Sequence, residues 1–73
     1  MNALPITTPY IALKDALKMS GLVMTGGMVK QILQDSEVSV NSVPETRRGR
    51  KLYPGDIVVY GSEQLVIVSG VKP

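Results

Sequence analysis

Apolar residues early in the chain recur at the spacing of one face of a helix. Leu13, Ala16 and Leu17 form an i, i+3, i+4 pattern within residues 11–19. The pattern stops at Gly21, and a glycine just after a helix commonly adopts the left-handed conformation that caps it. The pattern therefore predicts a helix of about two turns, which is too short to be stable in water without tertiary contacts.

The same spacing recurs at Val29, Ile32 and Leu33, which predicts a second amphipathic helix. Its expected start is Thr25, whose hydroxyl can accept a hydrogen bond from the first helical turn. The pattern runs out near Asp35. Because few residues separate the two predicted helices, we expect them to pack against each other as a helical hairpin.

Beyond the second helix the apolar positions follow the pattern of β-strands. Residues 38–41 alternate apolar and polar side chains, and residues 57–60 and 65–68 are rich in β-branched ones. Val43-Pro44-Glu45 is interpreted as a turn, and so is Pro54-Gly55-Asp56, where proline suits position i+1 and glycine position i+2. Helices followed by strands predict an α+β fold, with two short helices packed on a small, mainly antiparallel sheet.

The N-terminal residues differ from the rest of the chain because they hold two prolines, Pro5 and Pro9. Proline fixes its own φ and restricts the residue before it, which favours an extended arm or an edge strand. A chain of 73 residues has room for one domain. The expected organisation is an extended N-terminal arm at residues 1–9 and a single domain at residues 10–70.

Basic residues are concentrated in one short segment. Arg47, Arg48, Arg50 and Lys51 fall within five consecutive positions around Gly49. From this segment onward the chain carries five basic and two acidic residues, whereas the part before it carries three basic and four acidic ones. Guanidinium forks match phosphate oxygens, so the asymmetry favours a polyanionic partner. The alternative is a basic turn that is merely solvated.

The residue types present exclude several classes of chemistry. The chain has no Cys and no His, and its acidic residues lack the spacing of a metal site. Lys30 is interpreted as a solvated helix lysine rather than a nucleophile. We therefore expect no catalytic residue, metal, cofactor or small-molecule substrate. The lack of cysteine, and of any apolar run near the ~20 residues of a membrane span, favours a cytoplasmic protein.

Two further features leave alternatives open. Gly26 and Gly27 at the start of the second helix either form a tight turn between the helices or present backbone N–H groups to an anion. Tyr53 follows the basic segment and could stack on a base, but packing at the edge of the core with its hydroxyl in water is the favoured interpretation. Tyr10 and Tyr60 are interpreted as core or rim residues.

The order of these motifs resembles the S4 RNA-binding domain family, whose two helices precede a V-x-V-N-G strand and a Gly-Asp turn into another strand. Val38-Ser39-Val40-Asn41 and Gly55-Asp56 match these two motifs. Segments 25–30 and 47–52 are similar to the small stand-alone bacterial S4-like proteins called YaaA. The resemblance covers residues 10–68 and implies the S4-like, alpha-L fold.

The resemblance also implies an RNA-binding face made by the second helix and the basic loop. The side chains that it assigns to this face are Lys30, Arg47, Arg48, Arg50 and Lys51. Thr25-Gly26 stands where the family commonly begins this helix with a Ser-Arg pair, which leaves the backbone N–H groups of Gly26 and Gly27 to contact phosphate. Asn41 matches an asparagine with a role in turn structure, although Ser42 replaces the glycine that usually follows it.

The function implied is that of a non-catalytic module that binds structured RNA, with ribosomal RNA or a ribosomal particle as the expected partner. Such a module would act in ribosome assembly or translation. The alternative is a protein-interaction module whose basic loop engages an acidic protein.

Overall fold

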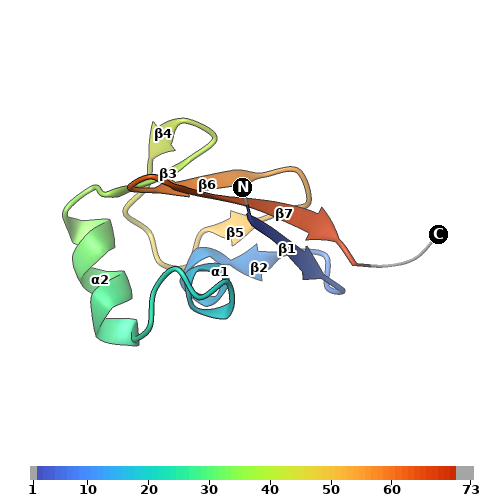
Figure 1. The fold of residues 1–73 in the computed structure, drawn as a ribbon, viewed down its shortest axis with the longest axis horizontal. Coiled ribbons are helices and arrows are strands. Elements are labelled where there is room, and N and C mark those ends of the chain that lie inside the picture. Colours follow the sequence, from blue (N-terminus) through green and yellow to red (C-terminus); the bar gives the residue numbers. More distant parts are fainter. Residues whose placement is uncertain (1, 71–73) are drawn as a thin grey trace.

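The computed structural model describes residues 2–70, which form two helices followed by most of a sheet (Figure 1). The elements are β1 (Asn2–Ile6), β2 (Ile11–Ala12), α1 (Leu13–Met19), α2 (Gly26–Gln34), β3 (Val38–Val40), β4 (Val43–Pro44), β5 (Lys51–Leu52), β6 (Ile57–Tyr60) and β7 (Glu63–Ser69). Within residues 2–70, neither helix has the length and apolarity that crossing a bilayer requires.

The main sheet has five strands in the order β1-β7-β6-β3-β4. Strand β1 runs parallel to β7, and the other neighbours are antiparallel. Figure 1 shows α1 and α2 on the same side of this sheet. The predicted α+β class, with two short helices on a mainly antiparallel sheet, is therefore confirmed.

Strand β1 lies at the edge of the main sheet, where Pro5 and its missing N–H are tolerated. Its register pairs Leu4 with Ile67 and Ile6 with Ser69. Leu4 and Ile6 are both buried, so the N-terminal segment contributes side chains to the same core as the helices.

A two-stranded antiparallel sheet made by β2 and β5 was not predicted. Ile11 and Ala12 form strand β2, so α1 begins at Leu13 rather than at Ile11. Two residues are too few to show the alternation by which a strand is recognised, which is why the sequence pattern missed this pair.

The core lies between the helices and the sheets. Both predicted helical stripes point into it, and Leu13, Ala16 and Leu17 are each fully buried. The core residues are Leu4, Ile6, Leu13, Ala16, Leu17, Val23, Val29, Ile32, Leu33, Val38, Val40, Leu52, Val58, Leu65 and Ile67. The predicted caps are also confirmed: Gly21 has φ 81°, and the Thr25 hydroxyl accepts a hydrogen bond from Met28 N at 3.2 Å.

The turns between β3 and β6 differ in part from the prediction. Val43 and Pro44 form strand β4 instead of a turn, because the reversal occurs at Asn41-Ser42. Both turn residues have positive φ, 51° and 71°, as a two-residue hairpin with the twist of its strands requires. Asn41 Nδ2 donates to Asp56 Oδ1 at 3.1 Å, and Asn41 Oδ1 accepts from Ile57 N at 3.0 Å. The turn-stabilising role expected of Asn41 therefore has a structural basis.

Candidate nucleic-acid interface

The basic loop, residues 45–51, is held against the start of α1 by its own backbone. Leu13 N donates to Arg50 O at 2.8 Å, and Lys14 N donates to Arg48 O at 3.0 Å. The N-cap residue of α1, Ala12, has no side chain that could cap the helix. Carbonyl groups of the loop therefore satisfy N–H groups of the first turn that have no partner within the helix.

A buried carboxylate anchors the other end of the loop. Glu45 is 6% exposed, and among residues 2–70 it is the one charged residue that is buried. Its Oε1 accepts from Arg47 Nη2 at 3.0 Å and from Arg50 Nη1 at 2.9 Å. Its Oε2 accepts from Arg47 Nε and from the backbone N–H groups of Thr46 and Arg47. The interpretation of Val43-Pro44-Glu45 as a turn did not anticipate this role of the Glu45 side chain.

These contacts set the charge of the anchor. The hydrogen bond from the Arg47 side chain, helped by that from Arg50, lowers the pKa of Glu45 from 4.5 to about 2, although burial opposes the shift. In turn, the hydrogen bond to Glu45 and the negative charge of Glu45 raise the pKa of Arg47. The Arg47 side chain is still 73% exposed, so its guanidinium is oriented by Glu45 yet open to solvent. The loop is therefore an ordered arrangement of cations.

Two hollows lined by basic residues flank this loop. The first, of about 560 Å³, is lined by Arg47, Gly49, Arg50 and Lys51. Arg47, Arg50 and Lys51, which the resemblance assigns to the RNA face, therefore share one concave surface with Gly49. Its cationic lining and open shape suit a phosphate group.

The second hollow, of about 170 Å³, joins both helices to the loop. It is lined by Lys14 and Lys18 of α1, Gly26 and Val29 of α2, and Arg48. Arg48 therefore lines a different hollow from its loop neighbours. Because Gly26 lies in the first turn of α2, the backbone N–H groups at this helix start add partial positive charge to the same place.

The structure does not bring all the predicted residues into these hollows. Lys30 is exposed on α2 and lies one turn beyond Gly26, on the same side of the helix. Gly27 is exposed and lines neither hollow. The predicted face thus has a centre at the loop and Gly26, with Lys30 farther along α2.

Tyr10 and Tyr53 form an exposed aromatic pair beside the loop. Their ring centroids lie 6.0 Å apart at an interplanar angle of 51°, and the Lys51 ammonium lies 4.8 Å from the centroid of the Tyr10 ring. Tyr10 is 42% exposed and Tyr53 is 49% exposed, so neither belongs to the core. Tyr60, by contrast, packs against the core as expected.

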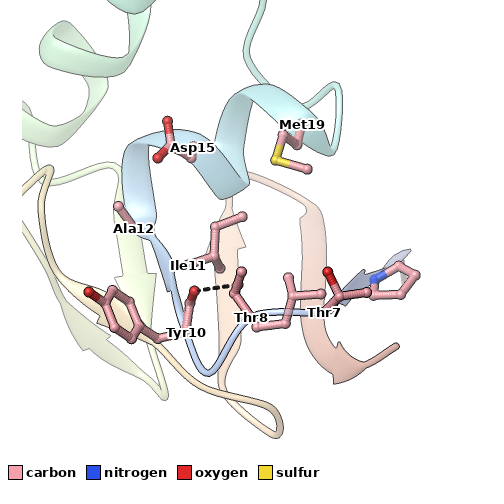
Figure 2. Close-up of a pocket in the computed structure, with 9 residues that line it drawn as sticks. Thr7, Thr8, Tyr10, Ile11, Ala12, Asp15 and Met19 are labelled. Atoms are coloured by element: carbon pink, nitrogen blue, oxygen red, sulfur yellow. Dashed lines mark hydrogen bonds between the residues drawn. The ribbon is translucent and has the colours of Figure 1, made fainter. Parts of the chain in front are cut away.

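A third, mostly apolar hollow of about 510 Å³ lies beneath α1. Figure 2 shows Tyr10 at one end of it and Met19 at the other, with Ile11 between them. The Thr8 hydroxyl donates to the Tyr10 carbonyl at 2.8 Å and so fixes the approach to β2. Within residues 2–70 no cluster of acidic side chains is suited to hold a metal ion.

Sequence reasoning missed Lys14 and Lys18 as site residues. They stand four positions apart on an exposed helix face, where like charges repel each other. That unfavourable pairing was a usable signal for an anionic partner. Glu45 carried a weaker signal, because an acid placed two residues before Arg47 and five before Arg50 can organise both.

Comparison with known proteins adds an independent line of observation. A family model for the S4 domain matches residues 4–68. The chain is 46% identical over 68 residues to a probable ribosome maturation protein, RlbA, of Bacillus subtilis (strain 168), covering 89% of this chain and 96% of that protein.

A solved structure is similar as well. It is the solution structure of YbcJ from Escherichia coli, described as revealing an alpha-L motif involved in RNA binding. The TM-score is 0.68 at 26% sequence identity, over 93% of this chain and 85% of YbcJ. The sequence motifs, the helix-helix-sheet architecture and these matches agree, and the chain belongs to the S4 domain family.

Proposed function

We propose that this protein is a non-catalytic RNA-binding module that recognises structured RNA, with ribosomal RNA as its target during ribosome assembly or translation in the cytoplasm. The observation that carries the proposal is the meeting of Arg48 with Lys14, Lys18 and the start of α2 around one hollow. Two cations from α1 and one from the loop meet there with no acidic neighbour among the residues that line the hollow, which favours an anion as the occupant.

The relatives support the same target. RlbA is named as a probable ribosome maturation protein, and the YbcJ motif is described as RNA-binding. Both similarities extend over most of this chain, so they include the loop and both helices. A small domain that presents fixed cations, rather than base-reading side chains in a groove, is suited to recognise the shape and backbone of a folded RNA.

The number of cations on this face gives the expected salt dependence of RNA binding. If about five cations meet phosphates, the slope of log K against log salt should be roughly −3.5 to −4.5. Affinity should then fall more than about 100-fold between about 50 and 200 mM salt.

The test is titration of fluorescently labelled ribosomal RNA with wild-type protein and with Lys18→Ala/Arg48→Ala. The loss of two phosphate contacts should weaken binding about 30-fold near 0.1 M salt and make the slope less steep by about 1.4 to 1.8. The matched control is Asn2→Asp/Gln64→Glu, which lowers the net charge equally on strands β1 and β7, away from both basic hollows.

The control should change affinity less than about threefold, because neither residue lines a basic hollow and salt screens charges that make no direct phosphate contact. If both double variants weaken binding equally, net charge alone drives the association and the assigned face is wrong.

One observation favours a protein partner as the second candidate. Val43 on the edge strand β4 is 59% exposed, and an exposed edge can pair with a strand of another chain. A pull-down with and without ribonuclease separates the two functions, because a directly bound protein survives digestion of the RNA.

A further inference from the structure

The β2–β5 ladder places two tyrosines and a lysine on one exposed face. Ile11 is paired with Leu52, and the antiparallel register continued by one step sets Tyr10 opposite Tyr53. Side chains alternate between the two faces of a strand. Since Leu52 is fully buried, its neighbours Lys51 and Tyr53 point to the other face, where Tyr10 meets them as a cross-strand partner.

This pair, which we call the tyrosine ledge (Tyr10 and Tyr53), has the geometry of an aromatic surface left open. The rings are tilted by 51°, so a planar group can lie flat on only one of them. The Lys51 ammonium already lies over the Tyr10 ring. Tyr53 is the more exposed of the two and is the ring on which a further planar group can stack.

Lys51 connects the ledge to the cationic surface of the loop. It lines the first hollow with Arg47, Gly49 and Arg50, and its ammonium is 4.8 Å from the Tyr10 ring centroid. An anion in that hollow and a planar group on Tyr53 would therefore be held by neighbouring parts of one surface. A nucleotide carries both groups, a phosphate and a flat base, at adjacent positions.

We propose that the tyrosine ledge binds an unpaired nucleobase of the target RNA by stacking it on Tyr53, while the adjoining phosphate lies at Arg50 and Lys51. This inference rests on the proposed function and deepens it, because phosphate contacts alone would accept any duplex. Bases that are free of pairing are the parts of folded RNA that aromatic side chains recognise. The ledge thus selects a bulge or loop beside a helix.

The experiment uses three RNA duplexes at low salt: one with a single unpaired adenosine, one with an abasic nucleotide at that place, and one fully paired. The abasic duplex keeps the phosphate and removes only the base. Wild-type protein should bind the adenosine duplex about 5- to 150-fold more tightly than the abasic one, the range found when a base–aromatic stack is removed. This comparison needs no protein variant, so it does not depend on a variant that folds.

Three substitutions then locate the contact. Tyr53→Ala should remove the preference for adenosine and leave the salt slope unchanged, because it takes away no charge. Tyr53→Phe should keep the preference, since the ring is retained. Lys51→Ala should make the slope less steep by about 0.7 to 0.9 and keep a preference for the adenosine duplex.

The outcomes separate this inference from the function on which it rests. Salt-dependent binding with equal affinity for the adenosine and abasic duplexes overturns the ledge alone, and this is also the result expected if the ledge serves a protein partner. A Tyr53→Ala variant that keeps the full preference overturns it as well. If wild-type protein binds none of the duplexes at low salt, the proposed function fails and the inference falls with it.

Discussion

At the scale of single residues, Glu45 decides how the basic loop behaves. Four arginines and lysines in five positions repel one another, and without a counter-charge they would favour an open, solvated turn. Glu45 accepts five hydrogen bonds from Thr46, Arg47 and Arg50. Its buried carboxylate thus binds two of the cations, the guanidinium groups of Arg47 and Arg50. Arg48 and Lys51 make no ion pair within residues 2–70, so their charge is available to a partner.

The depressed pKa of Glu45 gives a prediction on stability against pH. Its folded pKa of about 2 lies below the reference value of 4.5, so the unfolded chain binds the proton more readily. The stabilisation is therefore present above about pH 4.5 and is lost as the pH falls toward 2. Glu45→Gln should lower the free energy of unfolding by about 1 to 2 kcal/mol at neutral pH, a value reduced because Arg47 is exposed.

Urea unfolding of both proteins from pH 7 downward checks this. The difference between wild type and Glu45→Gln should lose more than half its size by about pH 3. Other carboxylates destabilise both proteins alike, so they cancel in the difference. A difference that stays constant across the range would contradict an ionised, hydrogen-bonded Glu45.

A basic side chain at Gly26 should strengthen RNA binding at the second hollow. A Cβ built there meets no atom within 4 Å, and φ is not in the left-handed range, so a side chain can start from this position without a clash or backbone strain. Gly26→Arg should add one phosphate contact, making the salt slope steeper by about 0.7 to 0.9 and the RNA affinity about fivefold higher near 0.1 M salt.

Stability should change little in Gly26→Arg, because better helix propensity is offset by a cation at the helix start. Gly27→Arg is the matched control: it adds the same charge one residue along, at a position that lines neither hollow. Equal gains in the two variants would show that position does not matter and would contradict the assigned hollow.

At the scale of elements, the β3–β4 hairpin shows how a sequence departure is accommodated. Ser42 has φ 71° where the S4 pattern commonly has glycine, and a left-handed conformation is unfavourable for a residue with a Cβ. The turn holds because Asn41 is bonded to both Asp56 and Ile57. Asp56 Oδ2 also accepts from Tyr53 N at 2.8 Å, so one carboxylate links this hairpin to the turn after β5.

Ser42→Gly should therefore raise the free energy of unfolding by about 0.5 to 1 kcal/mol. Ser62→Gly is the control, since it makes the same change in the β6–β7 turn at a residue whose φ is not positive. It should be neutral or destabilising, because glycine gains entropy in the unfolded chain. Thermal unfolding of both variants measures the contrast, and an equal shift in the two would refute the strain at Ser42.

Elements with a regular apolar pattern could be predicted from the sequence, whereas the two-residue strands could not. The two helical stripes and the strands at β3, β6 and β7 follow from spacing, because each buries one regular face. The pairing of β2 with β5 and the burial of Glu45 depend on contacts distant in sequence, which no local pattern records. The loop cations were found from composition, whereas Lys14 and Lys18 required knowing that α1 packs beside Arg48.

At the scale of the whole molecule, the proposed binding surface is built around one loop. The second hollow joins α1, α2 and Arg48, the first lies on the loop itself, and the tyrosine ledge continues it through Lys51. These features would contact several phosphates and, next to them, an unpaired base. The five-stranded sheet, with β1 and β4 at its edges, supports this surface and lines neither hollow.

The most direct test of this account is sedimentation of cell extract through a gradient at low salt, with detection of the protein across the fractions. Wild-type protein should travel with a ribosomal particle and be released as the salt concentration rises. Lys18→Glu/Arg48→Glu, which leaves the Glu45 contacts intact and should unfold like wild type, should stay at the top of the gradient. Wild-type protein that remains at the top at low salt, or a folded variant that still travels with the particle, would contradict the account.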